Sequence, residues 1–502
     1  MATSTFKNLP TNFTISEDGN YAVLSVPIEK SDNDDRSYRL IRLSNELEAL
    51  LIHDAKTDKS SAAMDVHVGH LSDPDNLQGL AHYCEHLLFL GTEKYPKENE
   101  YVDYLSKHSG RSNAFTSADC TNYYFEVGPD FLEGALDRFA QFFVAPLFDP
   151  NCVDREIHAV DSKYKKNLQL DGWRMRQLEK SLSNPKHPYS HFSTGNLETL
   201  KENPIKQGLN IRDELIKFHD KYYSANIMKL VVLGKESLDQ LSQWVIEKFS
   251  AVKNKSIPIP TYDDSPLTEN ELSNQIFVNP VKDPTNYLSH LIGHEGVGSL
   301  LTLLKKKGWV NYLNAGYNGY IGFGFFNISI DLTESGLANY EDVVVHVFQY
   351  IEMLRQVGTQ EWIYHEVKKM REISFRFKEK SVPSYYTSSL SNNMQLPCPR
   401  ECILSTSLLR EFNPQLISES LELLRYDKFV LRLASQSFTE FDQREKWYGT
   451  EYKTETLSDK LVQALKNIMT HSDLALPIPN EFIPNNFETN KTEILTVCLI
   501  NS

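Results

Sequence analysis

A short apolar segment that carries three ionisable side chains constrains this chain more than any other feature. Between Gly79 and Leu90 the apolar residues recur with a helical period, and Gly91 then provides a helix stop. His82, Glu85 and His86 lie inside this segment. The pattern predicts a short, largely buried helix that presents three polar groups among apolar neighbours.

The spacing of these three side chains is typical of a metal site. Two histidines at i and i+4 project from one face of a helix, so both imidazoles can reach one ion, with Glu85 beside them. Neutral imidazoles hold Zn2+, the ion acidifies a bound water, and the carboxylate takes the proton as the water attacks a peptide carbonyl. The order HxxEH is the inverzincin arrangement. From the residues alone, the alternative is an ordinary surface cluster that binds no metal.

The length of 502 residues exceeds the ~250–300 residues at which a single core stops growing, so at least two domains are expected. The stretch from Ser256 to Pro266 contains three prolines and an acidic pair, which predicts a linker. We therefore place the first domain at residues 1–259 and the second at 260–502. Strand-like and helical stretches alternate in both, which predicts the α+β class, with each domain an α/β sandwich of a mostly antiparallel sheet packed against helices.

Several elements of the first domain can be placed from periodicity alone. Apolar residues on either side of a polar turn predict two strands between Tyr38 and Ile52, and alternation predicts a strand at Met64–Val68. Aromatic and β-branched residues predict another strand at Thr121–Val127. Helical spacing continues from Leu132 to Phe143, and a further single helix is expected over residues 153–178.

The charge balance limits the classes of partner. The chain has 52 Lys and Arg residues against 67 Asp and Glu residues, a formal net charge of -15, which argues against nonspecific binding to nucleic acid or to anionic lipid. No run of residues approaches the ~18–20 apolar residues of a membrane span, and the first residues lack the apolar core of a signal peptide. We expect a cytoplasmic protein without a membrane span.

The segment around the predicted helix, Leu80–Pro96 (LAHYCEHLLFLGTEKYP), closely resembles the zinc helix of the insulin-degrading enzyme (insulysin) family of zinc metallopeptidases. Further segments resemble the same family in the same order: 112–116 (SNAFT), 122–125 (NYYF), 134–139 (GALDRF), 184–188 (NPKHP), 290–296 (HLIGHEG), 447–450 (WYGT) and 480–484 (NEFIP). The resemblance thus covers nearly the whole chain.

The resemblance implies the amino-terminal half of a clamshell peptidase, in which two homologous domains form one wall of a chamber for short unfolded peptides. It also implies roles for single residues. The metal ligands would be His82 and His86, the general base Glu85, and the carboxylate behind the ligands Glu156. Peptide substrate would add as an extra strand along Asn113, Ala114 and Phe115. Trp173 would form a wall of the pocket beside the scissile bond, where Arg176 replaces a residue that is usually aromatic. The remote site for a peptide's amino terminus would consist of His290, Gly293 and Glu295.

The position of the family's third zinc ligand, a glutamate, is occupied here by Lys163. A charged amine ~4 Å from a divalent ion would be repelled by roughly 8 kcal/mol at an effective dielectric constant near 20. Deprotonating a lysine at pH 7 costs about 4.6 kcal/mol, so a neutral amine is the cheaper ligand but still a poor one. We therefore expect weak retention of Zn2+. We also expect the Lys163 amine to lie within ion-pairing distance of Glu85 or Glu156, the alternative being that its long stem carries it into water.

Two other stretches depart from the family. The connection near residues 283–290 is shorter than the family's, which implies a missing strand and an exposed sheet edge. The last residues, 492–502, no longer resemble the family, and no second half follows them. These departures predict a partner chain, either a complete homologue or a separate carboxy-terminal half.

These observations predict an insulysin-like zinc metalloendopeptidase of short peptides whose activity is weak or absent. Two alternatives stay open. The chain can be a pseudoenzyme that binds peptides or a partner without cleaving them, or it can be a truncated product without a selected function.

Overall fold

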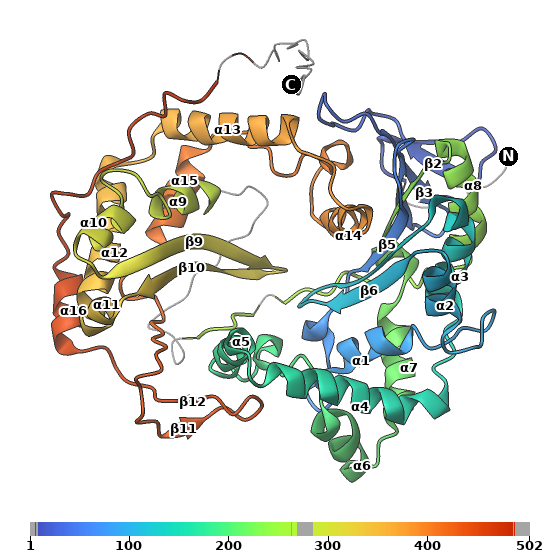
Figure 1. Cartoon of the computed structure of the whole chain (residues 1–502), viewed down its shortest axis with the longest axis horizontal. Coiled ribbons are helices and arrows are strands. Elements are labelled where there is room, and N and C mark those ends of the chain that lie inside the picture. The colour runs from blue at the N-terminus through green and yellow to red at the C-terminus, as the bar shows by residue number, and fades with distance from the viewer. Residues whose placement is uncertain (1–5, 7–8, 263, 269–284, 485, 487–502) are drawn as a thin grey trace, which may run out of the picture.

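The computed structural model describes residues 6, 9–262, 264–268, 285–484 and 486 (Figure 1). The centre of the first part of the chain is an eight-stranded sheet. Its strands, in spatial order, are β1 (Phe13–Ile15), β2 (Tyr21–Leu24), β3 (Ser37–Leu43), β4 (Glu48–His53), β8 (Met228–Gly234), β5 (Ser60–Val66), β7 (Thr121–Val127) and β6 (Arg111–Thr116). Only β4 and β8 are paired in parallel, so the sheet is antiparallel-rich, as the sequence predicts.

Helices cover one face of this sheet and contribute to one large apolar core with it. The helices of this part of the chain are α1 (Leu80–Leu87), α2 (Glu100–Lys107), α3 (Leu132–Val144), α4 (Pro150–Asn167), α5 (Asp171–Ser181), α6 (Asn203–Lys206), α7 (Ile211–Tyr222) and α8 (Leu238–Phe249). The strands and helices predicted at residues 38–52, 64–68, 79–90, 121–127 and 132–143 are confirmed within a few residues.

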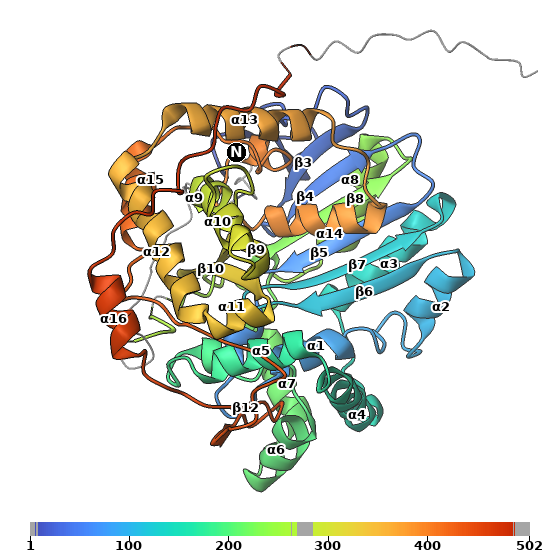
Figure 2. The same cartoon turned by 60° about the vertical axis from the view of Figure 1, so that its left-hand side comes forward.

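The central strands are buried on both sides, which explains their uninterrupted apolar sequence. Successive side chains of a strand point to opposite faces. Accordingly, Ala49 and Leu51 of β4 belong to the core under the helices, whereas Leu50 and Ile52 belong to a second core on the other face. That second core is closed by α14 (Pro383–Asn393), which contributes Tyr386 and Leu390. This helix packs against β5, β7 and β8 and lies in front of the sheet in Figure 2.

The single helix predicted over residues 153–178 is wrong, because the chain forms α4 and α5 with a break between them. Leu170 has an extended conformation, and its amide donates to the Asn167 carbonyl in a tight turn. The neighbouring Asp171 and Gly172 are weak helix formers, so little in this stretch favours a continuous helix. The break lets Trp173 and the rest of α5 take a direction different from that of α4 (Figure 1).

Residues beyond 285 form a second group of elements around its own apolar core, opposite the sheet in Figure 1. Besides α14 they are α9 (Thr285–Ile292), α10 (Leu300–Lys306), β9 (Val310–Tyr320), β10 (Phe323–Leu332), α11 (Glu334–Ala338), α12 (Tyr340–Val357), α13 (Glu361–Arg376), α15 (Pro414–Glu422), β11 (Gln443–Arg444), β12 (Glu451–Tyr452) and α16 (Asp459–Lys466). The strands β9 and β10 pair as a long antiparallel ribbon. The mixed α+β class is confirmed, and the boundary between residues 259 and 260 stays a prediction.

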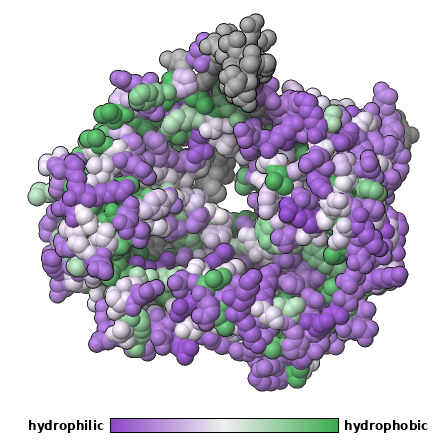
Figure 3. Space-filling model, viewed as in Figure 1, coloured by the Kyte–Doolittle hydropathy of each residue, from purple (hydrophilic) through white to green (hydrophobic). Residues whose placement is uncertain are grey.

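Two of the expected departures fall partly or wholly outside the described residues. Residues 283 and 284 and the tail at 492–502 are not described, whereas 285–290 belong to α9. Figure 3 shows a hydrophilic face with a hollow near its centre, between the two groups of elements. In the part of the chain that is described, no helix combines the length and apolar character needed to cross a bilayer.

Candidate metal and peptide site

The helix α1 begins where two segments of backbone approach closely. Gly79 has φ +91°, and a Cβ atom there would lie 2.3 Å from the Cα of Gly195, so only glycine fits. The amides of Gly79 and Ala81 each donate to the Asp73 carboxylate at 2.7 Å, which satisfies donors that a helix start leaves unpaired. The start of α1 is therefore fixed against the segment that contains residues 194 and 195.

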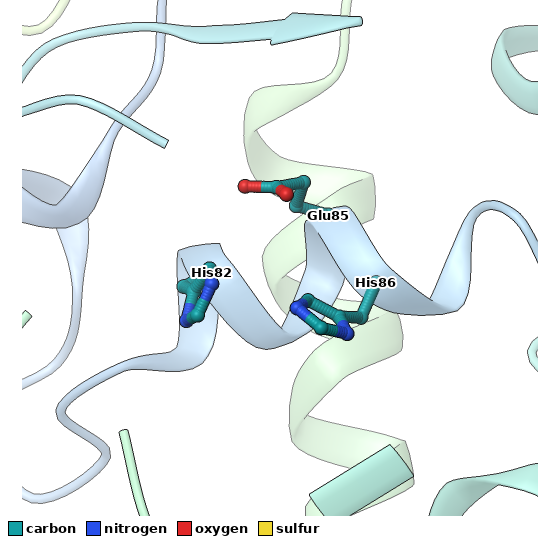
Figure 4. A group of neighbouring side chains, drawn as sticks. All are labelled: His82, Glu85 and His86. Atoms are coloured by element: carbon teal, nitrogen blue, oxygen red, sulfur yellow. The ribbon is translucent and has the colours of Figure 1, made fainter. Parts of the chain in front are cut away.

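The three predicted side chains are brought together on this helix. The possible ligand atoms of His82, Glu85 and His86 all lie within 4.8 Å of one another. The two imidazoles lie side by side on one face of α1, and Glu85 projects from another face (Figure 4). The side chains of His82 and Glu85 are buried, and His86 is half-buried. The surface-cluster alternative therefore does not describe these residues.

Each imidazole is held through its Nδ1 atom. His82 Nδ1 lies 2.6 Å from the carbonyl oxygen of Thr194, so it donates and leaves Nε2 unprotonated in the neutral ring. Burial, with the charges of His86 and Lys163, lowers the pKa of His82 to about 3, so this ring is neutral. His86 Nδ1 lies 3.2 Å from Glu156 Oε2 of α4. Both contacts are of the kind that orients histidine ligands toward a metal.

Glu85 is connected to the edge of the sheet. Thr116, at the end of β6, donates its hydroxyl to Glu85 Oε2 at 2.6 Å. Burial raises the pKa of Glu85, although the Thr116 hydrogen bond and the charges of His86 and Lys163 oppose this shift. A buried carboxyl group with a raised pKa is suited to taking up and releasing a proton.

Lys163 does not complete a zinc site with the two histidines. Its amine lies 3.1 Å from His82 Nε2, the atom whose lone pair a metal would need. Zinc sites are built from imidazole, thiolate and carboxylate groups, and here the third side chain is an amine that brings no negative charge. The two imidazoles fit Zn2+ in type and in orientation. The three side chains together do not fit it, because the third one is the Lys163 amine.

The expected ion pair of Lys163 is wrong. Among the described residues, the carboxylate oxygens of Glu156 and Glu85 are in contact with His86 and Thr116, and the lysine amine contacts His82 instead. The reason is direction: Glu85 points to β6, and Glu156 lies almost two helical turns before Lys163 on α4. The charge of Lys163 still acts on Glu85 without pairing with it.

This geometry changes the expected effect of replacing Lys163. Because the residue is exposed and its amine makes one hydrogen bond to a neutral ring, Lys163→Met should destabilise the protein by at most about 1 kcal/mol. Urea unfolding of this variant and of Lys166→Met, an exposed neighbour on α4, would measure it. A loss of about 3 kcal/mol or more for Lys163→Met alone would show that the amine is buried and paired.

The predicted peptide-binding strand is an edge. In the described sheet β6 pairs with β7 and ends the strand order, so Asn113, Ala114 and Phe115 lie along a free side. Phe115 is 41% exposed and Ala114 is buried. Because β6 packs beside α1, a peptide added along this edge would lie next to Glu85.

The other predicted residues lie on separate elements. Trp173 is in the first turn of α5 and is 39% exposed. His290 is in α9 and lines a cavity of about 340 Å³ with Asn286, Ser289 and Arg371, while Gly293 follows the helix and Glu295 is exposed. The sequence analysis did not predict that the Thr194 carbonyl and the Thr116 hydroxyl belong to the site. Of the two residues, only Thr116 lies in a segment that resembles the family, 112–116.

Comparison with protein families matches three consecutive parts of this chain. Residues 48–186 match the model described as Insulinase (Peptidase family M16). Residues 210–289 and 280–371 match the Peptidase M16 inactive domain, and residues 375–498 match the middle or third domain of peptidase M16. The expectation that the chain departs from the family at residue 492 is therefore wrong as far as residue 498.

Individual relatives agree with these matches. The insulin-degrading enzyme of Homo sapiens is 49% identical over 92% of this chain and 47% of its own length. The A-factor-processing enzyme of Saccharomyces cerevisiae is 47% identical over 94% of this chain and 48% of its own. The crystal structure of pitrilysin superimposes with a TM-score of 0.86 at 30% identity, covering 93% of this chain and 52% of that one. The chain spans about half the length of the relatives it matches.

Proposed function

Since the chain belongs to the insulinase family, peptidase family M16, we propose that it binds short extended peptides and hydrolyses them weakly or not at all. The contact between the Lys163 amine and His82 Nε2 carries this proposal. A zinc ion bound there would have to displace that amine and would lack the anionic third ligand that balances its charge.

Peptide binding needs none of the metal ligands. An added strand forms main-chain hydrogen bonds with the free edge of β6, a mode that gives affinity with little sequence preference. The exposed Phe115 on this edge offers an apolar contact for a side chain of the peptide. Short unfolded peptides fit such an edge because their own backbone groups are unpaired.

We expect a labelled unfolded peptide to bind in the presence of a chelator and a quenched peptide to remain uncleaved with added zinc. Fluorescence anisotropy and cleavage assays measure the two properties separately. Placing a lysine on an edge strand opposes strand addition, so Phe115→Lys should weaken binding by roughly threefold or more. Val357→Lys is the matched control, because Val357 is 45% exposed at the end of α12.

Two results would contradict the proposal. Peptide binding that is lost with chelator would mean that a metal holds the peptide. Efficient cleavage that is sensitive to chelator and abolished by Glu85→Gln would mean that the site is an active zinc endopeptidase. One observation favours this second candidate function, zinc-dependent cleavage. Thr194 and Glu156 hold the Nδ1 atoms of His82 and His86, so neither Nε2 atom is used in these contacts. A cytoplasmic location and a partner chain stay predictions.

A further inference from the structure

A group of buried nitrogen atoms without hydrogen-bond partners lies apart from the metal-site histidines. The atoms are Lys180 Nζ, both ring nitrogens of His70, His187 Nε2 and His191 Nδ1. The four residues are between 1% and 7% exposed. We call them the lysine–histidine cluster. Buried polar atoms are nearly always satisfied in folded proteins, so this concentration of unsatisfied atoms needs an explanation.

Three elements bring the cluster together. Lys180 lies on α5, His70 on the short helix η1 (His70–Ser72), and His187 and His191 on either side of the short helix η3 (Pro188–Ser190). Both α5 and η1 pack against η3. The His187 ring also packs edge-on against Phe323 of β10, with centroids 5.1 Å apart, so an apolar ring covers this side.

The unsatisfied atoms are mostly donors. His187 Nδ1 accepts the Tyr189 amide at 3.0 Å, so in the neutral ring the proton is on Nε2, which has no partner. The ammonium of Lys180 offers three protons and accepts none. A neutral His70 offers one further proton from a ring whose two nitrogens are both unsatisfied. The second ring nitrogen of His70 is an acceptor, and so is His191 Nδ1, because His191 Nε2 faces the Asp75 carboxylate at 3.4 Å. Three of the five unsatisfied atoms are therefore donors, and a ligand with several acceptor oxygens can satisfy them.

Charged side chains of both signs act on the cluster: Asp73 and Glu179 on Lys180, and Asp75 on His191. The charges of Lys180, Arg176 and His191 all act on His70. Burial, followed by the charge of Arg176, lowers the pKa of Lys180 to about 7. An anion beside the Lys180 amine would stabilise its charged form and so oppose this lowering of the pKa.

The two carboxylates that act on Lys180, those of Asp73 and Glu179, are already engaged. Asp73 accepts the amides at the start of α1, as described above. Glu179 accepts the Tyr189 hydroxyl at 3.0 Å and pairs with Arg432 at 3.2 Å. Among the residues that the structure describes, no carboxylate hydrogen-bonds the Lys180 amine.

We propose that the lysine–histidine cluster binds a small oxyanion of the phosphate type. Several acceptor oxygens on one ion can satisfy donors from the neighbouring elements α5, η1 and η3. The small exposed fractions of the four residues favour a free ion over a side chain of a peptide. Because Asp73 follows η1 and fixes the start of α1, the bound ion also steadies the support of the metal-site helix. The site does not depend on the peptide-binding function proposed above.

The proposal is tested with inorganic phosphate on the full chain, in chloride buffer at constant ionic strength. We expect saturable binding by isothermal titration calorimetry and a saturable rise in the unfolding temperature at millimolar phosphate, with no rise when chloride replaces phosphate. Acetate in a parallel titration shows whether a carboxylate alone is sufficient. Saturable binding of either ion supports an oxyanion site, and no saturable binding of either one overturns it.

Variants locate the bound ion. Lys180→Gln should weaken phosphate binding at least about tenfold, because hydrogen bonds from a charged donor are the strong ones. Lys186→Gln, which removes one exposed charge from the same segment, should leave binding unchanged. If Lys180→Gln does not fold, His70→Leu takes its place with the same expectation. Unchanged affinity in Lys180→Gln or in His70→Leu, or an equal loss in Lys186→Gln, overturns the proposal.

Discussion

Replacing Lys163 with glutamate is expected to raise the affinity for zinc at least about tenfold, since a carboxylate would then stand where the amine now meets His82 Nε2. The substitution removes a positive charge beside the ion and adds the anionic ligand that the site lacks. The two imidazoles need no rearrangement, because Thr194 and Glu156 already hold their Nδ1 atoms.

Competition with a chromophoric chelator measures this change. Lys166→Glu is the matched control, because it makes the same change of charge at an exposed position of α4 and should leave zinc affinity unaltered. Equal zinc affinities of the wild type and Lys163→Glu would mean that another residue already completes the site or that residue 163 does not face it.

The largest loss of stability is expected from Glu48→Gln. Glu48 is buried in β4, and its carboxylate pairs with Lys229 of β8 at 2.9 Å, with Arg400 at 3.0 Å and with Arg42 of β3 at 3.3 Å. Glutamine keeps the shape but removes the charge, so Lys229, itself 7% exposed, is left without its anion. Breaking a buried ion pair in this way costs about 3–5 kcal/mol.

Chemical denaturation of Glu48→Gln and Glu46→Gln tests this expectation. Glu46 pairs with the same Arg42 at 3.5 Å but is more exposed, so its replacement should cost less than about 1 kcal/mol. Similar free energies of unfolding for the two variants would show that Glu48 does not balance buried charge. Arg400 follows α14 in the chain, so its ion pair with Glu48 also joins the segment after α14 to β4.

Local patterns predicted the elements whose environment is local. Apolar residues on either side of a polar turn located β3 and β4, alternation located β5, and aromatic and β-branched residues located β7. Helical spacing located α1 and α3, because the residues that these elements bury recur with a regular period in the sequence. The break between α4 and α5 was missed, since apolar residues continue with helical spacing across Leu168 and Leu170. A turn that depends on a few backbone hydrogen bonds changes the spacing of apolar residues very little, so this spacing does not reveal it.

Contacts between segments that are distant in the sequence could not be predicted from local patterns. The return of α14 to the first sheet joins residues more than 300 positions apart, such as Ser61 and Thr387, whose hydroxyls lie 2.7 Å apart. Within the candidate site, spacing identified His82, Glu85 and His86, but the carbonyl of Thr194 carries no side-chain signal. The position of the Lys163 amine was misjudged because the directions of Glu85 and Glu156 are set by tertiary packing.

The zinc content of the wild-type chain tests the central claim most directly. The purified protein is incubated with excess zinc, freed of loosely bound ions by gel filtration, and assayed by atomic emission. The contact between Lys163 and His82 predicts well under one equivalent of zinc per chain. One equivalent that survives filtration and is lost in His82→Ala would contradict the claim that Lys163 disables the site.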